Sequence, residues 1–184
     1  ENGIQHYLAE HAGFPLTVSE ESRYFHTGEE LFEEMLKKIS EAEEYIFIEF
    51  FILAEGKMWD EIHTVLKRKA AEGVEVRIIF DDFGSIKRQH KDFLNRVTAA
   101  GIKISVFNPI KPSFNMFMNN RNHRKIVIID GKVAVTGGLD IGDEYINKIE
   151  RFGYWMDCAA VFTGDAARSF SIMFMSMWTF ITGE

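Results

Sequence analysis

The amino-acid sequence predicts an α/β fold, with a mixed, largely parallel sheet flanked by helices on both faces. Along the chain, helical spacing of apolar residues alternates with continuous runs of β-branched and aromatic residues, which is typical of such a sheet. The 184 residues are 46% hydrophobic, and the chain contains no linker, internal repeat or low-complexity segment. We therefore expect residues 1–184 to form a single domain.

The elements of the first half follow from local patterns. A capping box at Thr27 to Glu30 marks the start of one helix, and Gly73 and Gly101 mark the ends of two others. In order, we expect a helix over 27–39, a buried strand over 45–53, a helix over 58–71, a strand over 74–80, a helix over 91–100 and a strand over 102–107.

After residue 108 the alternation changes. Residues 109–122 form a loop with an apolar stretch at 114–118, which we expect to insert among acyl chains or to pack under another domain. Asp130-Gly131 is a hairpin signal between strands at 125–129 and 133–136. A helix starting near Ile141, a strand near 154–162 and a last helix from about Asp165 complete the prediction.

Composition excludes several classes of protein. The net charge of −7 argues against a protein that coats nucleic acid, because phosphate affinity comes largely from clustered Lys and Arg. One cysteine excludes an internal disulfide framework. No uncharged apolar run reaches the roughly 18 residues that span a bilayer. The chain begins at Glu1 without Met, so we expect it to be a piece of something longer.

The candidate catalytic residues lie at and after residue 123. On a strand, His123 and Lys125 project to one face, where an imidazole can attack and an ammonium can hold a negative oxygen. Asp130, at the strand end, could reach back to the imidazole. Gly137 and Gly138 allow backbone N–H groups to approach a phosphate. From spacing alone, other interpretations remain open. His123 could be a structural residue, Asp130-Gly131 could be only a turn, and Gly137-Gly138 could be only a bend.

His123-x-Lys125-x-x-x-x-Asp130, with Gly-Gly seven residues later, resembles the HKD signature of the phospholipase D superfamily. Further segments resemble bacterial cardiolipin synthases over nearly the whole chain: Asn2-Gly3-Ile4, Glu49-Phe50-Phe51-Ile52, residues 81–85, residues 119–125, Gly142-Asp143-Glu144-Tyr145, residues 151–155 and Met177-Trp178. Members of that family carry N-terminal membrane helices and two HKD halves. This chain is similar to the first half, without the membrane helices.

The resemblance implies a phosphatidyl transfer between two phosphatidylglycerol molecules that releases glycerol and needs no metal or cofactor. His123 would form the phosphohistidine or serve as acid for its twin, Lys125 would bind the non-bridging oxygens, and Asp130 would orient the site from behind. Because nucleophile and acid are both needed, one HKD copy requires a second half or a homodimer mate. A full-length parent would sit at the bacterial cell membrane, and this piece would be soluble.

The sequence departs from the family pattern at two places. Asp140 stands where relatives usually place Asn, and a carboxylate there would repel a phosphate unless it only caps the next helix. Residues 155–159 lack the Arg and Asp-Thr that relatives often carry.

For three acidic residues, the sequence leaves two possible roles open. Glu49, inside an apolar run, either faces Lys125 or His123 at the floor of the substrate pocket or forms a structural ion pair with a neighbouring helix. Asp81 and Asp82, at the carboxyl end of a strand, are favoured as a turn with helix capping over metal ligands.

Two other functions are consistent with the sequence. A single-HKD homodimer could act as a phosphodiesterase or nuclease, although the net charge and the apolar loop favour a lipid substrate and no nucleic-acid partner. Alternatively, the isolated lobe is folded but inert.

Overall fold

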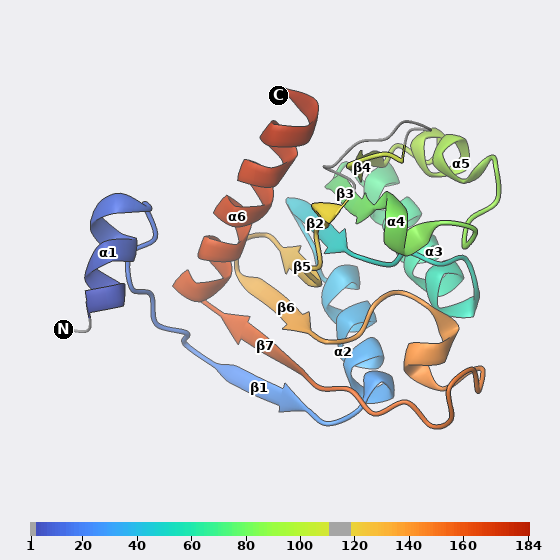
Figure 1. Cartoon of the computed structure of the whole chain (residues 1–184), viewed down its shortest axis with the longest axis horizontal. Coiled ribbons are helices and arrows are strands. Elements are labelled where there is room, and N and C mark those ends of the chain that lie inside the picture. Colours follow the sequence, from blue (N-terminus) through green and yellow to red (C-terminus); the bar gives the residue numbers. More distant parts are fainter. Residues whose placement is uncertain (1–2, 111–118) are drawn as a thin grey trace.

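The computed structural model describes residues 3–110 and 119–184 (Figure 1). Its elements follow the chain in this order: α1 (Gly3–His11), β1 (Ser22–Phe25), α2 (Gly28–Ser40), β2 (Tyr45–Phe50), α3 (Lys57–Ala71), β3 (Glu75–Asp81), α4 (Asp82–Ser85), α5 (Phe93–Ala99), β4 (Lys103–Phe107), β5 (Ile126–Ile129), β6 (Val133–Gly137), the 3-10 helix η2 (Asp143–Ile146), β7 (Ala159–Thr163) and α6 (Asp165–Thr182).

The strands form one seven-stranded mixed sheet in the order β1-β7-β6-β5-β2-β3-β4. Among the strands of the described residues, only the β2–β3 and β3–β4 pairs are parallel. The pairs from β2 through β5, β6 and β7 to β1 are antiparallel. The α/β class and the mixed sheet are thus confirmed, but "largely parallel" holds only for the β2-β3-β4 part. Crossover helices α3 and α5 join those strands, whereas a tight turn joins β5 to β6 and imposes antiparallel pairing.

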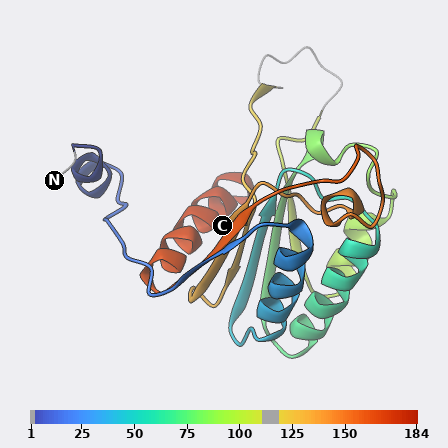
Figure 2. The same ribbon diagram turned by 90° about the horizontal axis from the view of Figure 1, so that it is seen from below.

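Helices cover both faces of the sheet, as predicted (Figure 2). On one face, α2 and α3 pack through Leu31, Met35 and Ile62 against a core that includes Val127 of β5. On the other face, α6 contributes Phe174 and Trp178 to a smaller core with Phe47, Ile126 and Ile128. Successive residues of β5 therefore belong alternately to the two cores, and this alternation decides which side chains can reach the site.

Most boundaries agree with the sequence patterns. Thr27 caps α2 by accepting a hydrogen bond from Glu30 N. Asp130 and Gly131 both have φ near +60°, as the tight turn between β5 and β6 requires (φ +53° and +63°). The helix expected near Ile141 is only the short η2, and β7 starts at Ala159, later than predicted.

Two elements were not expected. β1 has only Phe25 buried, so no alternating pattern marks it in the sequence. α1 has no buried residue and stands beside the body of the molecule (Figure 1). The apolar stretch 114–118 lies outside the described residues. None of the helices described is both long enough and apolar enough to cross a bilayer.

Candidate active site

His123 and Lys125 lie just before β5 and point to the same side, as their spacing predicted. Lys125 Nζ is 3.3 Å from His123 Nδ1 and 3.3 Å from the His123 carbonyl oxygen. The His123 side chain is exposed, whereas Lys125 is only 7% exposed. The Lys125 carbonyl accepts a hydrogen bond from Thr136 Oγ1 (2.9 Å), which holds this segment against β6. An open imidazole thus stands beside a buried ammonium.

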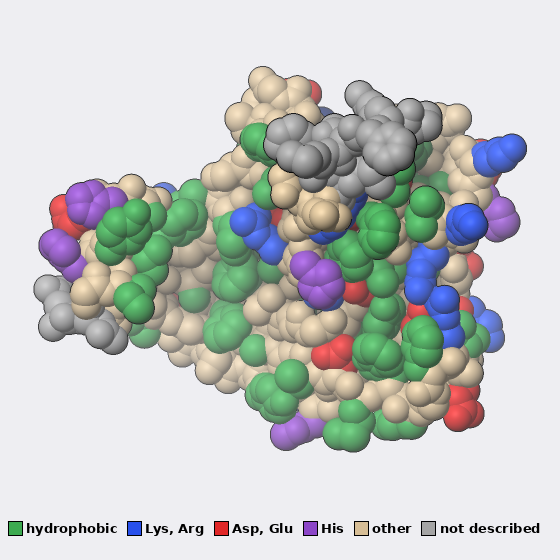
Figure 3. Space-filling view, in the orientation of Figure 1, with side chains coloured by type: hydrophobic (Ala, Val, Ile, Leu, Met, Phe, Trp, Pro, Cys, Tyr) green, Lys and Arg blue, Asp and Glu red, His purple; other side chains and the backbone are tan. Residues whose placement is uncertain are grey.

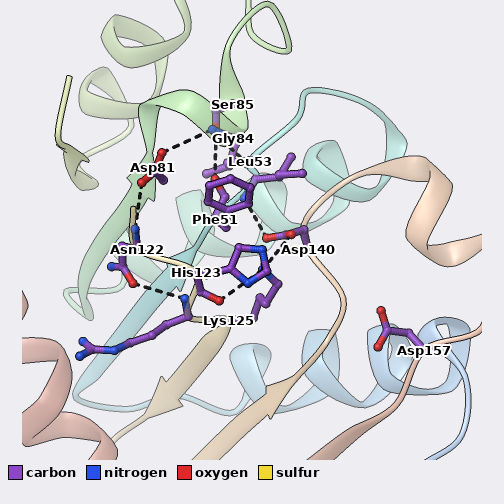
Figure 4. Close-up of polar contacts among 12 residues, drawn as sticks. Phe51, Leu53, Asp81, Gly84, Ser85, Asn122, His123, Lys125, Asp140 and Asp157 are labelled. Atoms are coloured by element: carbon purple, nitrogen blue, oxygen red, sulfur yellow. Dashed lines mark hydrogen bonds and ion pairs between the residues drawn. The ribbon is translucent and has the colours of Figure 1, made fainter. Parts of the chain in front are cut away.

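Phe51, which follows β2, forms one wall of the site. Its ring centroid is 4.6 Å from that of His123 and 5.3 Å from Lys125 Nζ (Figure 4). Below, the Lys125 side chain lies among Leu31, Met35 and Val127, around a cavity of only about 10 Å³. That space holds at most one water molecule and is too small for a phosphate ligand.

Asp140 is the partner of Lys125. Its Oδ2 lies 3.0 Å from Lys125 Nζ, and its Oδ1 accepts a hydrogen bond from Ile52 N at 2.8 Å. The segment is fixed in place, because Ile141 N donates to Ile52 O and Ala54 N donates to Ile141 O. Burial raises the pKa of the Asp140 carboxyl, and the Ile52 N–H and Lys125 oppose that shift. Of the two roles considered for Asp140, the structure favours the pocket.

The helix-capping role belongs instead to the neighbouring segment. Asp143 accepts hydrogen bonds from Lys57 N and Met58 N (3.0 and 2.8 Å) and so caps α3, while the N-cap of η2 is Gly142. Glu144, which is buried, binds Arg88 (2.6 Å) and Arg151 (3.1 Å). Asp143 and Glu144, which belong to the quoted motif at residues 142–145, therefore connect η2 to α3 and to two arginines.

Glu49 is fully buried on the opposite face of the sheet from Lys125. Its Oε1 accepts hydrogen bonds from Asn122 Nδ2 and Arg124 Nη1. Within the described part of the chain, no donor reaches Oε2. Burial raises the pKa of Glu49, and the contacts with Asn122 and Arg124 oppose that shift. Glu49 is thus neither on the floor of the Lys125 pocket nor paired with a helix.

Asp81 closes the same network from β3. Its carboxylate accepts hydrogen bonds from Phe83 N (2.8 Å), Asn122 N (3.0 Å) and Arg121 Nη1 (3.2 Å). The capping interpretation of Asp81 is confirmed. Asp82 accepts a hydrogen bond from Ile110 N (2.6 Å). Among residues 3–110 and 119–184, no group of three or more His, Cys, Asp or Glu side chains could hold a metal ion.

Asp130 is not brought to the imidazole. It follows β5 at the end away from His123, and its carboxylate accepts hydrogen bonds from Glu43 N, Glu44 N and Tyr45 N at 2.8–2.9 Å. Five residues of extended chain separate it from Lys125, or about 16 Å. The expected contact with His123 is therefore corrected: in this structure Asp130 fixes the entry into β2.

The two glycines are needed for close packing. A Cβ at Gly137 would lie 2.5 Å from Ala159 Cβ, and a Cβ at Gly138 would clash with Asp157 Oδ1. Gly138 N already donates to Cys158 O (3.1 Å), so this N–H is engaged within the lobe. Asp157 itself accepts from Trp155 Nε1 (3.0 Å) and has no drawn contact with the residues around His123 (Figure 4).

Sequence reasoning missed Phe51 and Asn122. Phe51 was part of a predicted strand, and only the end of β2 at Phe50 turns it toward His123. Asn122 lay inside the quoted segment 119–125. The available signal was its position: Asn122 alternates with His123 and Lys125, so in an extended segment its side chain points to the opposite face of the sheet.

Comparison with known proteins shows what this chain resembles. A family model described as "Cardiolipin synthase, PLD-like domain" matches residues 35–150. A Streptococcus mutans protein named only as uncharacterized is 46% identical over 96% of this chain and 38% of its own length. A cardiolipin synthase of Geobacillus kaustophilus is 35% identical over 92% of this chain and 34% of its own length. The chain therefore spans little more than a third of these relatives.

Among solved structures, Nuc from Salmonella typhimurium, a phospholipase D family member, shares the fold. The TM-score is 0.66 at 19% identity, and the similarity covers 86% of this chain and 95% of that chain.

Proposed function

This chain belongs to the cardiolipin synthase type of phospholipase D-like domain, and on that premise we propose that it is one half-site of a phosphatidyltransferase. The reaction joins two phosphatidylglycerol molecules and releases glycerol. One observation carries the proposal: the exposed His123 has its Nδ1 3.3 Å from the ammonium of Lys125, a residue that is only 7% exposed. That arrangement suits a nucleophile beside an oxyanion holder.

In the first step the ring nitrogen of His123 attacks the phosphorus of phosphatidylglycerol. A phosphorus–nitrogen bond forms, the bond to the glycerol oxygen breaks, and a second acid protonates the departing glycerol. In the second step the glycerol hydroxyl of another phosphatidylglycerol attacks, gives up its proton to the same group, and frees His123. Lys125 donates hydrogen bonds to the non-bridging oxygens throughout.

The acid in this scheme comes from another lobe, either a second HKD half or a homodimer mate. The surface beside the site supports such a partner, because exposed apolar side chains gather over α4 and the segment after η2 (Figure 3). They are Phe83, Ile86, Ile149, Phe152, Tyr154 and Met156, each at least half exposed. In the full-length parent this face would meet the second half or the membrane surface, and we place that parent at the bacterial cell membrane.

A homodimeric single-lobe phosphodiesterase is the second candidate. The observation in its favour is that the structural match to this single lobe covers 95% of the Nuc chain. An inert isolated lobe is the outcome expected if the partner half is required and absent.

The test is an assay of the full-length parent on phosphatidylglycerol vesicles, with glycerol and cardiolipin measured together. We expect equal amounts of both products, and neither from the His123→Ala variant. Free phosphatidic acid without cardiolipin would instead indicate hydrolysis. Turnover of bis(p-nitrophenyl) phosphate by the 184-residue chain, rising with the square of its concentration, would support the homodimeric alternative.

A further inference from the structure

The charges around His123 divide into two groups on opposite faces of the sheet. On the face away from His123, Glu49 contacts Arg124 and Asp81 contacts Arg121, so both carboxylates are matched by guanidinium groups. On the His123 side, the contacting ion pair is Lys125 with Asp140, with side chains 6% and 5% exposed. The ammonium that meets a phosphate is therefore already neutralised by a carboxylate.

We propose that Asp140 is a specificity-determining residue that makes the site accept monoanionic phosphodiesters and reject dianionic phosphomonoesters. This inference rests on the proposed function and deepens it by naming the substrate charge. A phosphate oxygen bound to Lys125 Nζ must lie a few ångströms from the Asp140 carboxylate. Repulsion scales with the product of the charges, so a dianion meets twice the repulsion that a monoanion meets.

Asp140 cannot leave when a ligand arrives. Its second oxygen accepts the Ile52 N–H, and the backbone on either side of Ile52 and Ile141 is paired. The carboxylate is thus a permanent part of the site rather than a counter-ion that a phosphate displaces. Inorganic phosphate and phosphomonoester lipids take on a second negative charge near and above neutral pH, whereas phosphodiesters cannot, so the Asp140 charge disfavours binding of those dianions.

The experiment uses two matched ligands on the 184-residue chain. Dimethyl phosphate is a monoanion, and methyl phosphate at pH 8 is a dianion of similar size. Binding is followed through the NMR signals of 15N-labelled histidine, since His123 lies beside Lys125. In the wild type we expect dimethyl phosphate to bind at least as tightly as methyl phosphate, whereas an unpaired ammonium would favour the dianion.

Asp140→Asn removes the charge and keeps an oxygen for the Ile52 N–H. We expect methyl phosphate to bind about tenfold more tightly and dimethyl phosphate only about threefold, because halving the charge halves the repulsion energy and takes the square root of the affinity ratio. Asp143→Asn is the matched control on the same segment. It keeps an acceptor oxygen for one of the two α3 N–H groups that Asp143 binds, and it should change neither affinity.

Each outcome bears on the proposal. Equal tightening of both ligands, no tightening, or wild-type preference for the dianion would overturn the role of Asp140 and leave the phosphate site intact. If neither ester shifts the His123 signals in wild type or variant, the phosphate site of the proposed function fails and the inference fails with it. The wild-type comparison alone decides the matter if the variant does not fold.

Discussion

The two ends of β5 hold the three residues of one sequence motif and use them differently. Before the strand, His123 is exposed and Lys125 is paired with Asp140 3.0 Å away. After the strand, Asp130 accepts three backbone N–H groups of residues 43–45. One end has an exposed imidazole beside a buried ion pair, and the other end satisfies backbone N–H groups where the chain enters β2.

The difference shows that residues of one sequence motif can have different roles. Those before the short strand β5 form the candidate active site, and the one after it stabilises the fold. Ile126–Ile129 are all buried, with alternate side chains in the two cores, so β5 is held rigidly on both faces. A residue at either end is positioned by the same packing. Changes at the two ends should therefore separate into effects on rate and effects on stability.

The largest expected effect is at the first end. In the assembled enzyme, His123→Ala should lower kcat roughly a thousandfold or more, because it removes the side chain that we propose as the attacking group. Urea unfolding of the 184-residue variant should give a free energy within about 0.5 kcal/mol of wild type, since the side chain is exposed. His90→Ala, at another exposed histidine, is the control for both measurements. A variant that keeps a tenth of the activity would remove His123 from the reaction.

At the other end, Asp130→Ala should cost about 2–3 kcal/mol of unfolding free energy, because backbone donors lose a charged acceptor. Alanine is also less suited to the left-handed conformation there, where φ is +53°. Asp130→Asn keeps one acceptor oxygen and tolerates that conformation, so it should cost less than half as much. The affinity of the folded variants for dimethyl phosphate should equal that of wild type. A weakened affinity with unchanged stability would return Asp130 to the site.

The smallest expected effect is on the pH dependence of stability, which we expect to differ in sign between two buried glutamates, Glu49 and Glu144. Burial raises the pKa of Glu49, so wild type loses stability relative to Glu49→Gln as pH rises from the ordinary glutamate range through that higher value. For Glu144 the pKa shift, and therefore the pH dependence of its contribution to stability, has the opposite sign. Although burial favours its neutral form, hydrogen bonds from Arg88 and Arg151 lower its pKa.

The Glu144 contribution is complete above the ordinary glutamate pKa and is lost as pH falls through the lowered value. Wild type should therefore exceed Glu144→Gln in stability at pH 7, with the gap closing in acid. Urea unfolding of wild type and both variants from pH 3 to 8 measures the two slopes. Slopes of the same sign for the two glutamates would contradict this assignment.

Local patterns were sufficient for most of the fold. The helices α2, α3 and α6 follow from 3.6-residue spacing, and the β5–β6 hairpin follows from Asp130-Gly131. The direction of the other strands did not follow, because a buried run of apolar residues is the same in parallel and antiparallel sheets. β1 was missed because three of its four residues are exposed.

The site divides in the same way. The two-residue period places His123 and Lys125 together without further information. Asp130 and Asp140 depend on contacts with residues 43–45 and 52, more than 80 positions away in the chain. No local pattern contains those contacts, so neither the contact of Asp130 with residues 43–45 nor that of Asp140 with Ile52 could be predicted.

The pairing of β1 with β7 sets an order of events during folding. The hairpin of β5 and β6 joins residues that are close in sequence and can form within microseconds. β1 has to wait, because Glu21 N donates to Thr163 Oγ1, 142 residues further along. On a ribosome the sheet therefore grows from its middle outward, and the N-terminal strand is added only after residue 163 has emerged. Until β7 has emerged, the outer edge of β6 is open, and that edge is the part of the nascent chain most exposed to pairing with a wrong partner.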